Sequence, residues 1–153
     1  GGGYGAFASI FAETHSLESY TIVDLDSILK LQEKFITYVY ENLDKPSSSR
    51  GITTQFKFVS SHTVEPISSD LLYSFLAFDE VPDEVQQRYL MQYVANAERG
   101  YLILCSSPSL IKVLYDRLVV IQPTAYLIFM DDRYGTLCDV EYFAMRLLWD
   151  NSS

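Results

Sequence analysis

Two stretches of sequence decide how this chain folds: GGGYGAF at residues 1–7 and YTIVD at residues 20–24. Glycines let the backbone turn tightly and approach a ligand closely, and the AFASIFAE segment that follows has the apolar spacing of a helix. YTIV has the length and composition of a buried strand, and it ends on Asp24. A glycine loop at a helix N-terminus, with a carboxylate at the tip of the next strand, is typical of a nucleotide-binding α/β domain.

Each half of this pattern has an alternative interpretation. GGGYGA satisfies G-x-G-x-x-A at Gly1, Gly3 and Ala6, which fits a dinucleotide site, a methyl-donor site or a tight turn without a ligand. Asp24 could cap the next helix, but Asp26 or Ser27 is better placed to do so. We therefore interpret Asp24 as a ribose ligand.

In such folds the glycine loop follows a buried parallel strand, and here no residue precedes Gly1. We expect residues 1–153 to form a single domain that is N-terminally truncated and lacks its first strand. Apolar surface uncovered by that strand is expected to favour self-association of the fragment.

Composition excludes some classes of function. The chain of 153 residues is 48% apolar and 14% aromatic, which suffices for a packed core. Twenty acidic and eleven basic residues give a net charge of −9, which argues against nucleic acid as a partner. Neither a membrane-spanning run nor a signal peptide is recognisable, and Cys105 and Cys138 form no CxxC motif. These features predict reduced thiols in a cytoplasmic protein without a membrane partner.

The periodicity alternates between strands and helices as far as residue 117, which predicts an α/β fold with a largely parallel sheet and helices on both faces. Gly100 is expected to end the third helix, and the last strands to form an antiparallel hairpin around Tyr134 and Gly135. Segment 45–51 is expected to be a polar loop, either a mobile surface segment or an insertion. The expected helices are 6–13, 26–40, 82–97 and 109–117; the expected strands are 20–23, 55–59, 70–75, 101–104, 118–121, 125–130 and 140–148.

The stretch DLLYSFLAFDEVP, residues 70–82, carries further candidates. Ligands bind at the carboxyl ends of parallel strands, so Ser74, Phe78 and Glu80 fall at the edge of the expected site. Phe78 is equally explained as a core residue, and Asp79 and Glu80 as favourable charges before the next helix. We predict no metal site, because the adjacent carboxylates Asp131 and Asp132 lie in a DDRYG segment typical of a turn.

With GGGYG, YTIVDLDSILKLQ and DLLYSFLAFDEVPDEVQQRYL in place, the chain resembles the class I S-adenosylmethionine-dependent methyltransferases. More narrowly, it resembles a family of sugar O-methyltransferases, over most of residues 1–107. The resemblance implies a Rossmann-like methyltransferase fold, with adenine against the loop at residues 60–62. It also implies that S-adenosylmethionine contacts Gly1, Gly3, Gly5, Asp24, Ser61 and Ser74.

The implied activity is methyl transfer to a hydroxyl of a small-molecule or glycan acceptor. Such an enzyme must align the acceptor oxygen with the methyl group and remove its proton. His62 is one candidate base because histidine titrates near neutral pH, although a solvated loop histidine is common. Glu80 is the other, because of its position. The rival hypotheses are an NAD-linked oxidoreductase and a non-catalytic Rossmann-like binding domain.

Overall fold

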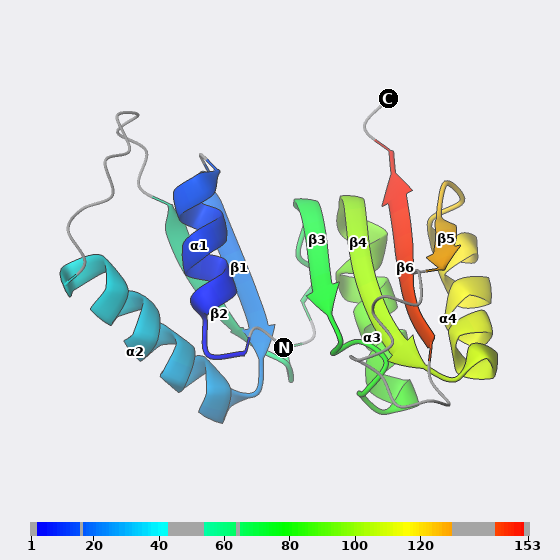
Figure 1. The fold of residues 1–153 in the computed structure, drawn as a ribbon, viewed down its shortest axis with the longest axis horizontal. Helices are drawn as coiled ribbons and strands as arrows, with labels where there is room; N and C mark the ends of the chain where they lie inside the picture. Colours follow the sequence, from blue (N-terminus) through cyan, green and yellow to red (C-terminus); the bar gives the residue numbers. More distant parts are fainter. Residues whose placement is uncertain (1–2, 16, 43–53, 64, 130–142, 152–153) are drawn as a thin grey trace. The chain divides into compact units, whose positions relative to one another are not determined.

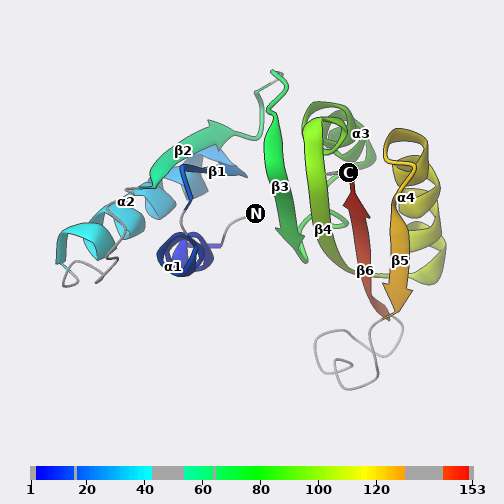
Figure 2. The same cartoon turned by 90° about the horizontal axis from the view of Figure 1, so that it is seen from above.

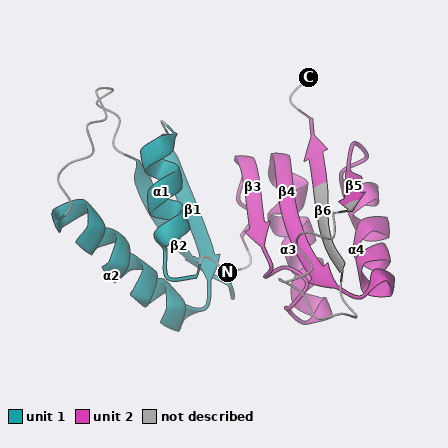
Figure 3. Cartoon of the chain, viewed as in Figure 1, with its two compact units in different colours: residues 1–63 teal, residues 64–153 magenta. Residues whose placement is uncertain are grey.

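The computed structural model describes residues 3–15, 17–42, 54–63, 65–129 and 143–151 (Figure 1; Figure 2 gives the view turned by 90°). The chain divides into two compact units, residues 1–63 and 64–153 (Figure 3). Each unit contains its own sheet and its own hydrophobic core.

The first unit is built from two helices and two parallel strands. The strands pair in register from Ser19 beside Gln55 to Asp24 beside Ser60, so that Asp24 and Ser60 end their strands together. This pairing places the turn after the second strand next to Asp24. The elements are α1 (Ala6–Thr14), β1 (Ser19–Asp24), α2 (Asp26–Asn42) and β2 (Gln55–Ser60).

Every second side chain of β1 and β2 contributes to the core of the first unit. Side chains two residues apart share a face of a strand, and this face packs against both helices. Ile22 is 4% exposed and lies at the centre of this core with Ala8, Leu29 and Ile36. The aromatic and aliphatic residues around it are Tyr20, Phe35, Tyr40, Phe56 and Phe58.

The second unit holds a four-stranded sheet in the order β3-β4-β6-β5. The β3 and β4 strands are parallel, whereas β6 runs antiparallel to both of its neighbours. The elements are β3 (Ser69–Phe75), α3 (Asp83–Gln92), the 3-10 helix η1 (Val94–Asn96), β4 (Ala97–Ser106), α4 (Pro108–Ile121), β5 (Tyr126–Phe129) and β6 (Phe143–Asp150).

Helices α3 and α4 pack on one face of this sheet and lie behind it in Figure 1. Leu102 and Leu104 of β4 are at most 1% exposed and contact the buried stripe of α4, which consists of Ile111, Leu114 and Leu118. On the opposite face several apolar side chains are exposed, and the rings of Tyr73 and Tyr101 stack there with their centroids 5.7 Å apart. Its exposed residues are Leu71, Tyr73, Phe75, Tyr126 and Ile128.

Two element predictions are wrong. Gly100 does not end the third helix; α3 ends at Gln92, and Gly100 lies inside β4. The stretch 118–121, expected as a strand, is the last turn of α4. Leu118 continues the stripe of Ile111 and Leu114 at helical spacing, and its burial on that stripe outweighs the β-propensity of the valines that follow.

The other described elements agree with the expected order of helices and strands, including the antiparallel pairing of β5 with β6. Tyr134, Gly135, the loop 45–51 and the Asp131–Asp132 pair lie outside the described residues. None of the helices in the described ranges has the length and apolar character needed to cross a membrane.

Candidate functional site

The glycine loop is described from Gly3 onward, since Gly1 lies outside the described residues. Gly3 has a φ of +56° and Gly5 a φ of +103°, values that side chains other than glycine rarely adopt. A Cβ atom on Gly5 would lie 3.3 Å from two side-chain carbons of Ile36, whereas one on Gly3 would meet no atom of the described residues within 4 Å. The loop therefore packs tightly on α2 at Gly5, and no described side chain crowds it at Gly3.

Helix α1 starts at Ala6, directly after this loop. Gly5 is its N-cap residue and provides no side-chain cap, while the Gly5 carbonyl accepts the amide of Ser9 at 3.1 Å. The first amides of a helix have no intrahelical acceptor, and the helix dipole makes this end attractive to anions. The start of α1 is thus suited to the carboxylate or phosphate of a ligand.

Asp24 ends β1 beside the glycine loop. Its Oδ1 atom accepts the backbone amide of Leu25 at 2.8 Å, and its Oδ2 atom accepts the side-chain Nε2 of Gln32 at 2.9 Å. Its backbone carbonyl accepts the amide of Ser61 at 2.7 Å, which fastens the ends of β1 and β2 together. These contacts hold the carboxylate in one orientation at the carboxyl end of a parallel strand, as a ribose ligand requires.

Gln32 completes the arrangement, although the sequence prediction did not include it. Its side chain comes from α2, is 0% exposed and also donates from Nε2 to the carbonyl of Gly3 at 2.8 Å. One buried amide group therefore bridges the glycine loop and the carboxylate of Asp24. The hydrogen bonds bring Gly3, Asp24 and Gln32 together in the first unit, with Ser61 bonded to the backbone of Asp24.

Ser61 and His62 lie in the turn that follows β2. Ser61 is 7% exposed, whereas the side chain of His62 is exposed. The amide of His62 donates to Oγ of Ser60 at 3.2 Å, and the amide of Thr63 donates to the Ser60 carbonyl at 2.9 Å. Ser61 therefore lies beside the backbone of Asp24, and His62 lies one residue further along the turn with its side chain exposed.

Ser74 and Glu80 belong to the second unit. Ser74 is half-buried in β3 beside Leu102, and Glu80 is exposed in the turn before α3. Between them, Leu76 has a φ of +51°, an uncommon value for a leucine, and Phe78 is 6% exposed in the core. The core interpretation of Phe78 is therefore correct.

Asp79 makes a contact that the sequence analysis did not include. Its Oδ2 atom accepts the backbone amide of Cys105 at 2.8 Å, so it anchors the end of β4. Cys105 takes part in a disulfide, and the expectation of a reduced thiol is wrong at this residue. The cytoplasmic location thus loses the support that free thiols would give it.

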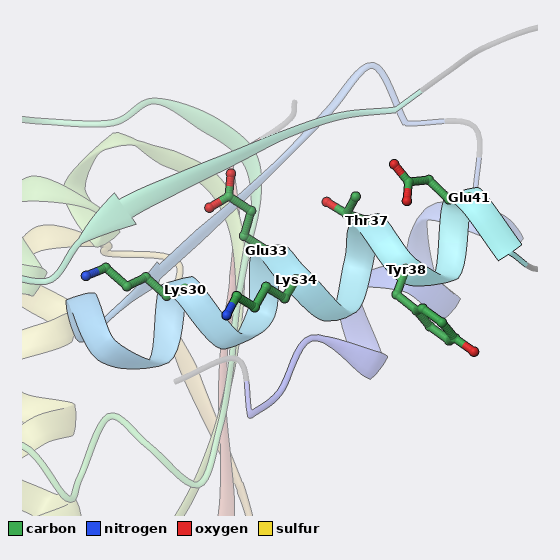
Figure 4. Close-up of a pocket in the computed structure, with 6 residues that line it drawn as sticks. All are labelled: Lys30, Glu33, Lys34, Thr37, Tyr38 and Glu41. Atoms are coloured by element: carbon green, nitrogen blue, oxygen red, sulfur yellow. The ribbon is translucent and has the colours of Figure 1, made fainter.

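A surface depression on α2 lies apart from this arrangement (Figure 4). All its lining side chains come from α2, and neither Asp24 nor Gln32 is among them. Lysines and glutamates interleaved along one helix are typical of a solvated face. We therefore do not place the functional site there. The lining residues are Lys30, Glu33, Lys34, Thr37, Tyr38 and Glu41.

Comparisons by sequence find no relatives: no protein-family model matches the chain, and no curated protein matches it. Solved structures do match. The methyltransferase domain of bacterial CtHen1 has a TM-score of 0.67 and 12% sequence identity, with 99% of this chain and 87% of that chain covered. The methyltransferase domain of METTL16 has a TM-score of 0.52 and 13% identity, with 100% and 72% covered. The chain has the Rossmann-like α/β fold of methyltransferase domains, as expected.

The same fold occurs in an enzyme with a different chemistry. A pericyclic reaction enzyme has a TM-score of 0.56 and 13% identity, with 97% of this chain and 41% of that chain covered. A fold can carry several reactions, so the function has to be argued from the residues of the site.

Proposed function

We propose that this chain is a methyltransferase domain that uses S-adenosylmethionine as methyl donor. The observation that carries the proposal is the hydrogen-bonded unit of the glycine loop, Gln32 and Asp24 in a Rossmann-like fold. Its parts fit the donor. No atom of the described residues crowds Gly3, and the start of α1 has no side-chain cap, which suits the methionine carboxylate; Asp24 suits the ribose.

When bound, S-adenosylmethionine supplies a methyl group on a sulfonium centre that is already a strong electrophile. The protein therefore has to hold donor and acceptor in line and receive the proton of the acceptor hydroxyl. Asp24 and the glycine loop would orient the donor. Either His62 in the turn after β2 or Glu80 in the turn after β3 would receive the proton; both side chains are exposed.

For the acceptor we propose a hydroxyl of a sugar or glycan. The support is the resemblance of the loop, strand and DLLYSFLAFDEVP motifs to sugar O-methyltransferases. The net charge of −9 favours such an acceptor over a nucleic acid, because phosphate-backbone binding depends on clustered lysine and arginine.

The donor is tested by calorimetric titration of S-adenosylhomocysteine and, separately, NAD into this chain, Asp24→Ala and Asp26→Ala. Asp26 is an exposed aspartate two residues away and is the matched control. We expect S-adenosylhomocysteine to bind in preference to NAD, and the binding to be lost in Asp24→Ala and kept in Asp26→Ala. Preference for NAD, or equal binding by all three proteins, contradicts the proposal.

The acceptor and the base are tested by transfer of a labelled methyl group from S-adenosylmethionine to a panel of oligosaccharides, with RNA as comparison. Label is expected in the oligosaccharides; label only in RNA contradicts the proposed acceptor. His62→Gln and Glu80→Gln then identify the base. The variant that lowers kcat without changing the affinity for S-adenosylhomocysteine marks the residue that receives the proton.

A further inference from the structure

Gln32 occupies a position where an apolar side chain is expected. It lies on the buried side of α2 with Leu29, Ile36 and Val39, and it is 0% exposed. Burying a polar amide is unfavourable unless its hydrogen bonds are satisfied, and a leucine or methionine would fill the same space without this cost. A buried glutamine on an apolar stripe therefore needs a specific explanation.

The two acceptors fix the orientation of the amide. Nε2 lies 2.8 Å from the carbonyl oxygen of Gly3 and 2.9 Å from Oδ2 of Asp24, and neither oxygen can donate when the carboxylate is ionised. With its oxygen and nitrogen exchanged, Gln32 would place its own oxygen against two acceptors. The NH2 group therefore points at both, and Gln32 acts as a double donor.

The hydrogen bond from Gln32 to Asp24 complements the one from the backbone amide of Leu25. Leu25 holds Oδ1 through its backbone amide, and Gln32 holds Oδ2, so the two oxygens are fixed from separate directions. The plane of the carboxylate is thereby set. Recognition of two neighbouring hydroxyls depends on such a fixed plane.

We propose that Gln32 is a positioning residue for the donor: it holds the carboxylate of Asp24 in the orientation that binds the ribose hydroxyls and couples it to the glycine loop. This inference rests on the proposed function. Gln32 acts through Asp24 and the loop. The remaining Oε1 atom is buried and has no hydrogen-bond partner among the described residues.

The test compares two ligands, S-adenosylhomocysteine and its 2′,3′-dideoxy analogue, by calorimetry with wild type, Gln32→Met and Gln87→Met. Methionine has nearly the shape of glutamine but cannot donate, and Gln87 is an exposed glutamine of α3 that serves as the matched control. We expect Gln32→Met to weaken S-adenosylhomocysteine about tenfold and to leave the dideoxy analogue unchanged. Gln87→Met should bind both ligands like wild type.

Equal weakening of both ligands by Gln32→Met overturns the inference, because Gln32 would then support the fold without acting on the ribose contact. An unchanged affinity for S-adenosylhomocysteine overturns it as well and leaves the proposed function intact. If wild type binds no S-adenosylhomocysteine, the proposed function fails, and this inference fails with it.

A second variant keeps the inference testable if Gln32→Met does not fold. Gln32→Glu preserves size and places a second carboxylate against Asp24, and such a pair retains a shared proton at acid pH. The affinity of Gln32→Glu for S-adenosylhomocysteine, divided by that of wild type at the same pH, is expected to rise about tenfold when the pH is lowered from about 8 to about 5. A constant ratio of the two affinities over this range overturns the inference.

Discussion

Gly100 of β4 lies directly against the indole ring of Trp149 on the neighbouring strand β6. A Cβ atom on Gly100 would lie 1.9 Å from Cη2 of the ring, well inside van der Waals contact. The ring is 2% exposed, and its Nε1 atom donates to the carbonyl of Ala97 at 3.2 Å. The absence of a side chain at residue 100 is thus what admits the tryptophan into the core.

Gly100→Ala is therefore expected to destabilise the protein by about 3 kcal/mol, because the indole ring must move and its hydrogen bond is lost. Urea unfolding measures this change. In a Trp149→Leu background the same substitution should cost about 1 kcal/mol or less, since the methyl group then has room. Equal costs in the two backgrounds would show that the contact with Trp149 is not the cause.

The two described loop glycines should differ in their tolerance of alanine. Gly5 combines a φ of +103° with a close contact to Ile36, whereas Gly3 has a φ of +56° and no described atom within 4 Å of the position of a Cβ. We expect Gly3→Ala to cost about 1 kcal/mol and Gly5→Ala about 2 to 3 kcal/mol. Thermal unfolding of both variants checks the order, and a larger loss for Gly3→Ala would contradict it.

Asp79 and Glu80 are adjacent carboxylates with different surroundings. Asp79 accepts the amide of Cys105, while Glu80 is exposed. Asp79→Ala should lower the free energy of unfolding by about 1 to 2 kcal/mol, because the end of β4 loses its anchor. Glu80→Ala should change it by less than about 0.5 kcal/mol. Denaturant titration measures both changes. Equal losses for the two variants would indicate a general effect of negative charge before α3 and not the loss of the hydrogen bond to Cys105.

The order of elements in each unit could be predicted because local patterns decide it. Regular apolar spacing marks α1 and α2, and short β-branched or aromatic runs mark β1, β2 and β3. Gly100 misled the prediction because glycine usually interrupts an element, and the ring that requires a glycine there comes from Trp149, far along the chain. The antiparallel pairing of β6 with β4 likewise depends on packing between distant parts of the chain, so local sequence patterns do not reveal it.

The candidate site was predictable only in part. Gly3, Gly5 and Asp24 belong to a recognisable motif. In the structure the side-chain amide of Gln32 donates hydrogen bonds to both Gly3 and Asp24. Gln32 was missed because the sequence analysis searched motifs and strand ends, although a polar residue among Leu29, Ile36 and Val39 is a readable signal. The contact of Asp79 with Cys105 could not be predicted, because its partner is a backbone amide, which leaves no trace in sequence.

Tyr93 should make the protein sensitive to alkaline pH. Its side chain is 6% exposed, and its hydroxyl is buried with no hydrogen-bond partner among the described residues. Burial raises the pKa of Tyr93 above the ordinary value of 10.0, and the nearby Tyr89 raises it further, while Arg88 lowers it. The folded state therefore holds this proton more tightly than the unfolded state does.

The stabilising effect of Tyr93 is fully present below pH 10.0 and is lost as the pH rises through the higher pKa of the folded state. The free energy of unfolding should accordingly fall above pH 10.0 less steeply in Tyr93→Phe than in wild type, with little difference at neutral pH. Urea titrations at a series of pH values measure both slopes, with Tyr126→Phe on the exposed face of β5 as the matched control. Parallel curves for wild type and Tyr93→Phe would mean that other groups cause the alkaline loss of stability.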